Sequence, residues 1–363
     1  MGVVNERDGR PFVLGVIEGF YGRAWEWPVR EAYAGFLKSI AFDFYIYAPK
    51  SDPYLRKRWR EPWPDETFEH LTRTGSVYGN HRVHWGVGLS PFELYLSYDA
   101  TAKAALLDKV SSINQLNPDI LCVLLDDMKG DIPDLANTQA DIFQTIADAS
   151  TARRLILCPT YYSTDPILEK VFGAMPDRYW EVLGERIDPS VDIFWTGPKV
   201  CSTEYPGDHL NEVANRLGRK PFLWDNHPVN DSESRSKRLF LSAYENRPHN
   251  LGDWCSGHAI NPMNQAWLTR IPLWTLRESY DAGDAYNPRQ AFEASVNAQC
   301  DPELAQQILE DADGFEREGL NSMDKGRRQT LVAKYSEYGS EFASEIVDWL
   351  EGGYTFDPAC LTE

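Results

Sequence analysis

The 363-residue sequence is poor in basic residues and has no long uncharged apolar run. Its 36 lysines and arginines stand against 55 aspartates and glutamates, which gives a formal net charge of −19. This charge would repel both a phosphate backbone and an anionic membrane surface. No stretch approaches the roughly 20 apolar residues of a membrane span, and the first residues lack the pattern of a secretory signal. We therefore expect a cytoplasmic protein with neither nucleic acid nor membrane as a partner.

Several common catalytic signatures are also absent. The six cysteines are scattered singly, the seven histidines form no H-E-x-x-H motif, and the sequence contains neither a P-loop nor a G-x-S-x-G elbow. These absences disfavour zinc, nucleotide and serine-hydrolase chemistry. We expect reduced thiols, no metal and no other cofactor. Aromatic residues, in contrast, are abundant, with 12 Trp, 18 Tyr and 16 Phe, as in proteins with large cores or sugar-binding clefts.

Eight short apolar runs alternate with helix-like segments. Such runs are typical of strands that are buried on both faces of a parallel sheet, and eight of them predict a (β/α)8 barrel, with a doubly wound open sheet as the alternative. We place the catalytic barrel at residues 1–285 and a C-terminal helical region at residues 286–363. The predicted strands are residues 12–17, 42–47, 83–89, 120–125, 155–158, 191–195, 222–224 and 258–260.

The C-terminal region carries an apolar stripe with helical spacing. The stripe predicts one long helix, which packs either on the barrel or on the same helix of a second subunit in a homodimer. Gly352 and Gly353 end this helix, and we expect a frayed tail after them. The stripe consists of Leu331, Tyr335, Tyr338, Phe342, Ile346 and Trp349.

Polar, glycine and proline residues follow all eight predicted strands. In a barrel these positions meet on one face and can line one pocket. The most informative of them are Asp126 and Asp127, because two adjacent carboxylates can divide the roles of general acid and anion between them. Neighbouring strand residues point to opposite sides, so both reach one site only if the chain turns just after Leu125. The alternatives are a helix cap, or a divalent-cation site formed with Asp131 and Asp134.

This geometry favours substrate-assisted hydrolysis of an N-acetylated sugar. Two carboxylates on one side of a turn would face different parts of a substrate and would not flank one bond as acid and nucleophile. In substrate-assisted hydrolysis the 2-acetamido group of the sugar is itself the nucleophile. One aspartate would polarise the amide nitrogen, and the other would protonate the leaving oxygen.

Seven segments resemble the catalytic core of glycoside hydrolase family 84, which comprises O-GlcNAcases and bacterial β-N-acetylglucosaminidases. They are GVIEGFYG (15–22), YIYAPKSDPY (45–54), LLDDM (124–128), LCPTYY (157–162), WTGPKV (195–200), LWDNHPVND (223–231) and INP (260–262). The resemblance implies a (β/α)8 barrel that removes terminal β-linked N-acetylglucosamine with retention, through an oxazoline intermediate.

The resemblance also implies a role for individual residues. Asp126 corresponds to the residue that polarises the acetamido group, and Asp127 to the general acid that later acts as base. The family's sugar hydroxyl contacts correspond to Lys50, the backbone of Gly19, Asp231 and Asn261. Its acetamido contacts correspond to Asn226, Trp224, Cys158 and Tyr162. Tyr161 stands where relatives commonly have an acidic residue, so two phenols compete for the acetamido contact.

The natural substrate stays open at the level of sequence. The resemblance implies as partner either a glycan that bears terminal β-N-acetylglucosamine or an O-GlcNAc-modified protein, whereas hyaluronan fits poorly with the acidic charge. Two other functions are alternatives. The barrel would be a non-catalytic glycan-binding module, or a metal-dependent hydrolase that uses Asp126, Asp127 and Asp131.

Overall fold

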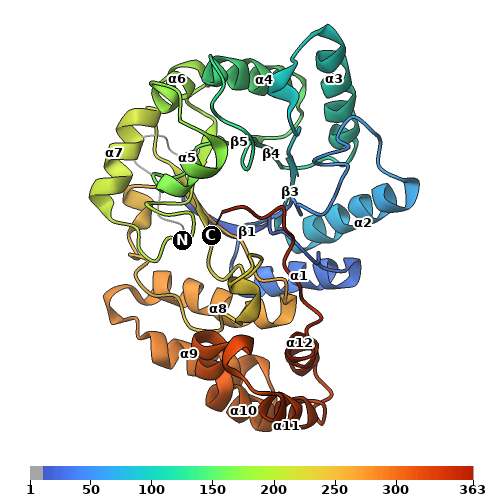
Figure 1. The fold of residues 1–363 in the computed structure, drawn as a ribbon, viewed down its shortest axis with the longest axis vertical. Coiled ribbons are helices and arrows are strands. Elements are labelled where there is room, and N and C mark those ends of the chain that lie inside the picture. Colours follow the sequence, from blue (N-terminus) through green and yellow to red (C-terminus); the bar gives the residue numbers. More distant parts are fainter. Residues whose placement is uncertain (1–10, 363) are drawn as a thin grey trace.

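The computed structural model describes residues 11–362, and its centre is a closed barrel of eight parallel strands in sequential order (Figure 1). Strand β1 pairs with both β2 and β8, which closes the ring. Each strand overlaps its predicted apolar run, so the (β/α)8 prediction is confirmed and the open-sheet alternative is wrong. The strands are β1 (Val13–Glu18), β2 (Phe44–Tyr47), β3 (His84–Leu89), β4 (Ile120–Leu124), β5 (Arg154–Cys158), β6 (Asp192–Trp195), β7 (Phe222–Asp225) and β8 (Gly257–Ile260).

Helices surround the barrel and continue beyond it. Two helices, α5 and α6, follow β5, and four helices, α9 to α12, follow the last barrel helix, α8. The helices are α1 (Trp27–Ser39), α2 (Asp65–His81), α3 (Ala100–Gln115), α4 (Leu135–Ala149), α5 (Pro166–Phe172), α6 (Tyr179–Arg186), α7 (Gly207–Leu217), α8 (Ala266–Ala282), α9 (Pro288–Gln299), α10 (Pro302–Asp313), α11 (Lys325–Tyr335) and α12 (Glu341–Leu350). None of the helices in residues 11–362 is long and apolar enough to cross a membrane.

Aromatic rings fill part of the barrel, and glycines make room for them. Phe44 and Phe194 lie with their ring centroids 5.9 and 5.4 Å from that of Phe222. A Cβ atom added at Gly15 would lie 2.4 Å from the ring of Phe44, and one added at Gly257 would lie 2.4 Å from the ring of Phe222. The barrel axis is therefore a packed core, and an open site has to lie at one end of it.

Helices α9 to α12 form a second helical layer beneath the barrel (Figure 1), and the predicted single long helix is wrong. The apolar stripe is divided between α11 and α12, because the segment from Ser336 to Ser340 interrupts the helix. This segment contains Gly339, and glycine favours non-helical backbone.

The two halves of the stripe pack into a second hydrophobic core. This core also contains residues from the loop after β7 and from α8. The stripe therefore packs on its own barrel, as the first of the two sequence interpretations expects. The barrel side contributes Leu239, Leu241, Met263, Leu268 and Ile271, all fully buried.

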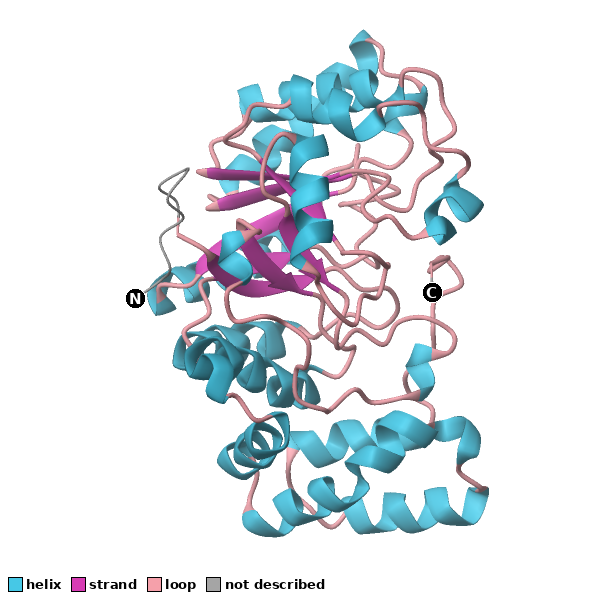
Figure 2. Cartoon of the chain, turned by 90° about the vertical axis from the view of Figure 1, so that its left-hand side faces the viewer, coloured by secondary structure: helices cyan, strands magenta, loops and turns pink. Residues whose placement is uncertain are grey.

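The segment after α12 returns to the barrel and is not frayed. In Figure 1 it runs from the helical layer back over the barrel, and Figure 2 shows the C terminus beside the loops that extend from one end of the strands. Tyr354 is 8% exposed and Thr362 is 9% exposed. The expectation of a frayed tail is wrong because contacts with the barrel bury these two side chains.

Candidate active site

The two adjacent aspartates lie at the end of β4, where the chain turns. Asp127 has a φ of +55°, in the left-handed region that Asp and Asn adopt more readily than most residues. Asp126 and Asp127 consequently both line one pocket at the carboxyl end of the barrel. The turn after Leu125, which both carboxylates need in order to reach one site, is present.

Asp126 is buried and has one oxygen free. Its Oδ2 atom accepts a hydrogen bond within an ion pair from the Lys50 ammonium group, and both side chains are almost fully buried. Its Oδ1 atom is also buried and has no hydrogen-bond partner among residues 11–362. An unpaired buried carboxylate oxygen is costly, so this atom is an acceptor that lacks a donor.

Asp127 is held by two phenols. Tyr21 donates to Oδ2 over 2.8 Å, and Tyr162 donates to Oδ1 over 2.9 Å. The Arg56 guanidinium group donates to the backbone oxygen of Asp127 over 3.2 Å and to the Ser90 hydroxyl over 2.9 Å. These contacts fix both the carboxylate and the backbone of Asp127.

The pocket contains about 510 Å³ of space not occupied by atoms, part of which is open to solvent. All ten predicted site residues line the pocket, and they come from the ends of six different strands. They are Gly19, Lys50, Asp126, Asp127, Cys158, Tyr162, Trp224, Asn226, Asp231 and Asn261. The structure thus brings the selected residues together, while the role of each one remains a prediction.

One wall of the pocket is a connected set of amides and an indole. Asn226 Oδ1 accepts from Trp224 Nε1 over 2.9 Å and from Asn261 Nδ2 over 3.0 Å. Asn261 Oδ1 accepts from the backbone N–H of Gly19 over 3.2 Å. A Cβ atom at Gly19 would lie 2.5 Å from the Trp224 ring, so only glycine allows this packing.

The loop after β7 carries Asp231 into the pocket. Arg235 donates to the backbone oxygens of Val229, over 2.9 Å, and Asn226, over 3.2 Å, and so holds this loop. The Asp231 carboxylate accepts the backbone N–H of Tyr21 over 2.7 Å. Burial raises the pKa of Asp231 to about 6, although the Tyr21 hydrogen bond opposes this shift.

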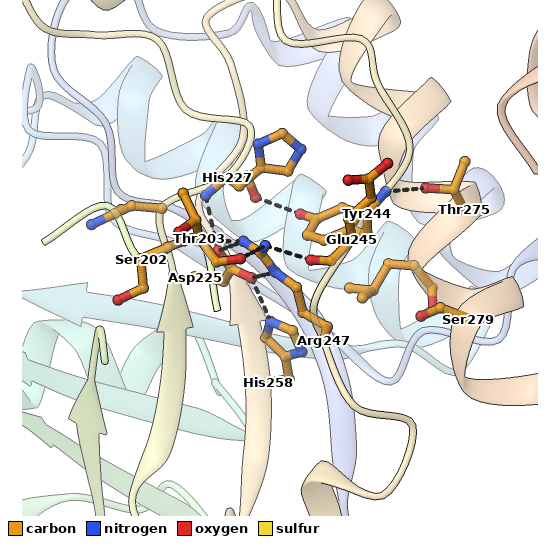
Figure 3. Close-up of polar contacts among 12 residues, drawn as sticks. Ser202, Thr203, Asp225, His227, Tyr244, Glu245, Arg247, His258, Thr275 and Ser279 are labelled. Carbon is orange, nitrogen blue, oxygen red and sulfur yellow. Dashed lines mark hydrogen bonds and ion pairs between the residues drawn. The ribbon is translucent and has the colours of Figure 1, made fainter. Parts of the chain in front are cut away.

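A buried ion pair anchors the end of β7 (Figure 3). Arg247 donates to both carboxylate oxygens of Asp225 over 2.9 Å, and His258 Nε2 lies 3.1 Å from Asp225 Oδ2. Arg247 also donates to the backbone oxygens of Ser202 and Thr203. Burial alone would raise the pKa of Asp225, but Arg247 and His258 hold it well below its ordinary value. This network ties β7 to the loop after β6, and both segments border the pocket.

Between the two neighbouring tyrosines, only Tyr162 lines the pocket. Tyr161 is turned away, and its hydroxyl donates to the backbone oxygen of Gly173 over 2.6 Å. Asp131 and Asp134 do not line the pocket either; Asp131 lies 3.4 Å from the Lys129 ammonium nitrogen, and Asp134 accepts from a neighbouring asparagine. Within residues 11–362 no group of three or more His, Cys, Asp or Glu side chains could hold a metal ion.

Several pocket residues were not predicted from the sequence. Tyr21 lines the pocket and lies inside the quoted GVIEGFYG segment, directly before a glycine. Its place in this motif after the first strand could have identified it as a pocket residue. Cys201 follows the quoted WTGPKV segment and lines the same pocket. Cys360 and Thr362 also line it, but they follow no strand, and no pattern in the sequence indicates their position.

Comparison with known proteins identifies the family. Residues 14–312 match the family model described as beta-N-acetylglucosaminidase. The chain belongs to this family. The resemblance to glycoside hydrolase family 84 is thereby confirmed.

Individual family members resemble the chain at moderate identity. The protein O-GlcNAcases of Rattus norvegicus and Mus musculus are each 29% identical to it over 284 residues, which is 75% of this chain. The chain spans only about 30% of the length of these curated relatives. The solved structure of a mutant O-GlcNAc hydrolase from Thermobaculum terrenum has a TM-score of 0.75 and 28% identity, and the match covers 93% of this chain and 80% of that one.

Proposed function

We propose that this chain is a retaining exo-β-N-acetylglucosaminidase that hydrolyses terminal β-linked N-acetylglucosamine by substrate-assisted catalysis. The observation that carries the proposal is the free Oδ1 atom of Asp126, buried in a pocket beside Asp127. An acetamido N–H would supply the donor that this oxygen lacks. A sugar without the acetamido group would leave it unpaired, and this difference gives the site its selectivity.

The first chemical step closes a ring within the substrate. Asp126, which pairs with Lys50, accepts a hydrogen bond from the acetamido N–H, and the acetamido oxygen attacks the anomeric carbon. The bond from that carbon to the leaving oxygen breaks, and Asp127 donates a proton to the leaving oxygen. The products are the free aglycone and a protonated oxazoline, whose N–H remains hydrogen-bonded to Asp126.

The second step restores the acetamido group. Asp127, now a carboxylate, removes a proton from a water molecule that attacks the anomeric carbon, and the oxazoline opens. Two inversions at the same carbon give net retention. Tyr162 is assigned to the acetamido oxygen, while Trp224 and Cys158 form the wall against the acetyl methyl group.

The remaining pocket residues bind the sugar hydroxyls. Lys50 and the Gly19 backbone are assigned to the 3- and 4-hydroxyls, Asp231 to the 4- and 6-hydroxyls, and Asn261 to the 6-hydroxyl. Asn226 supports the acetamido side. Neutral sugars need such paired donors and acceptors, and no metal or other cofactor has a part in either step.

The wider biology is also part of the proposal. Two curated relatives carry the name protein O-GlcNAcase, which supports O-GlcNAc-modified proteins as well as glycan ends as candidate substrates. We place the activity in the cytoplasm. The stripe, for which packing on a second subunit was the alternative to packing on the barrel, is buried in the chain's own second core, so a homodimer would need a different surface.

Release of 4-nitrophenol from its β-N-acetylglucosaminide tests the function. The assay is run beside the 4-nitrophenyl β-glucoside, with and without EDTA. We expect hydrolysis of the acetamido sugar alone, unchanged by the chelator. Absence of turnover by folded protein would support the non-catalytic glycan-binding alternative, and loss of activity in EDTA would support the metal-dependent one.

A further inference from the structure

The segment that follows α12 is anchored on the loop after β1. The Arg23 guanidinium carbon lies 4.9 Å from the centre of the Tyr354 ring, and Arg23 also pairs with Asp348 of α12. A Cβ atom added at Gly22 would lie 3.3 Å from the backbone oxygen of Thr355. The segment therefore crosses the edge of the barrel beside the loop after β1. Figure 2 shows the C terminus beside the loops at that end of the strands.

The far end of this segment enters the pocket. Cys360 and Thr362 line it together with the two aspartates, and Thr362 is only 9% exposed. A local turn shapes the segment, because the backbone oxygen and the side chain of Asp357 accept the N–H groups of Cys360 and Ala359, each over 2.9 Å. Leu361, between the two pocket residues, is 57% exposed.

The position of Thr362 relative to Asp127 defines which side of the pocket the segment covers. The Thr362 hydroxyl lies 3.5 Å from the hydroxyl of Tyr162, which donates to Asp127. Under the proposed function Asp127 protonates the leaving oxygen, so the aglycone departs on the side of Asp127. Thr362 consequently borders the aglycone side, and Cys360 lines the same pocket.

We propose that residues 355–362 form a wall that makes the enzyme select small aglycones over polypeptides. This inference rests on the proposed function. A serine- or threonine-linked sugar carries peptide backbone in two directions from the glycosidic oxygen, and a wall beside Asp127 obstructs one of them. A phenyl or single-sugar aglycone needs less room and binds without displacing the wall.

The test compares two substrates in the full chain and in a variant that lacks residues 355–363. We measure kcat/KM for an O-GlcNAc-modified peptide and for the 4-nitrophenyl glycoside, and we use the ratio of the two values. Removal of the wall is expected to raise this ratio by about tenfold or more, with the aryl value changed by less than about threefold. If the peptide-to-aryl ratio is unchanged while aryl hydrolysis is intact, residues 355–362 do not select against polypeptides, and the proposed function still stands.

Point variants keep the test valid if the deletion impairs folding. Thr362→Gly opens the wall and should raise the ratio, whereas Thr362→Trp should lower it. Leu361→Ala is the matched control, because its exposed side chain does not line the pocket and its ratio should match that of the full chain. Failure of the full chain and of every variant to cleave the aryl glycoside would reject the proposed function, and the wall with it.

Discussion

Asp127 carries the proton in the proposed mechanism, so its loss should matter most where the leaving group is poor. For Asp127→Ala we expect kcat/KM to fall by about 10²–10⁴ on an alkyl or sugar glycoside but far less on the 4-nitrophenyl glycoside, whose leaving group needs little protonation. The measurement is kcat/KM over a series of aglycones of different pKa. An equal loss across the series would contradict the assignment of Asp127 as general acid.

Asp231 should make the activity fall at acid pH, which would appear as an acid limb in the pH profile of kcat/KM. Its pKa is about 6, so above that pH it is a carboxylate that accepts two hydroxyls, and below it the bound proton removes one acceptor. We expect kcat/KM to fall as the pH drops through about 6, and the limb to be absent from Asp231→Asn, which should bind about tenfold or more weakly at pH 7. If the wild type and Asp231→Asn show the same acid limb in kcat/KM, the limb belongs to another titratable group.

The raised pKa of Asp231 also affects the stability of the fold, which should be higher at acid pH, where the activity is lower. The native state binds this proton more tightly than the unfolded chain, whose pKa is near 3.8, so the stabilising contribution is complete below that value. It is lost as the pH rises through 6. The melting temperature of the wild type, relative to Asp231→Asn, should therefore decrease between pH 4 and pH 7.

At the scale of single residues, motifs predicted the polar pocket well and its supports poorly. Asp126 and Asp127 were selected from their residue types and their place after a strand, and Asp231 from the family resemblance. Lys50 was assigned to sugar hydroxyls, but in the free pocket its ammonium group pairs with Asp126. This ion pair joins the ends of β2 and β4, which lie on either side of β3 in the barrel, so it follows from the assembled sheet and not from either sequence segment alone.

At the scale of elements, the clamp that Arg247 and His258 form around Asp225 at the end of β7 should stabilise the folded protein by several kcal/mol. Arg247→Met leaves Asp225 as a buried carboxylate without its main partner, which costs about 3–5 kcal/mol in comparable sites. We expect a marked fall in melting temperature, and in the surviving folded protein a larger change in KM than in kcat, because the clamp orients binding loops. Arg247→Lys should recover only part of the loss, since lysine cannot form the two-pronged pair.

A matched control for this clamp is Arg277→Met. Arg277 forms a partly exposed ion pair with Asp281 one helical turn away on α8. Such pairs contribute about 0.3–0.5 kcal/mol, so this variant should melt close to the wild type. If Arg247→Met and Arg277→Met lower the melting temperature equally, the buried network stabilises the fold no more than an exposed ion pair does.

The strands were predictable because each is an apolar run that is buried on both sides, and all eight runs form strands. The C-terminal helices were less predictable. The spacing of Leu331, Tyr335, Tyr338 and Phe342 fits one helix, but Tyr338 lies in the interruption, and the positions on the two shorter helices still face one core. Only tertiary packing decides between these arrangements, because a short interruption such as Ser336–Ser340 barely disturbs the periodicity.

At the scale of the whole molecule, the predicted boundary after residue 285 cuts through a shared core. We expect a fragment of residues 1–285 to be poorly soluble, because it would expose Leu239, Leu241, Met263, Leu268 and Ile271, each worth about 1.5–3 kcal/mol when buried. Gel filtration and binding of a hydrophobic dye would check this. A fragment of residues 1–353 keeps the second core and should stay soluble; a soluble, cooperatively melting 1–285 fragment would restore the barrel as an independent domain.

The left-handed backbone of Asp127 has a consequence for the capture of bound substrates. Asparagine adopts the left-handed conformation readily, whereas most other residues are strained in it. An amide at this position can still accept from one of the hydroxyls of Tyr21 and Tyr162 and donate to the other. Asp127→Asn, which lacks the proton to give but keeps the shape of the pocket, is therefore the variant of choice for trapping an intact glycoside in a crystal.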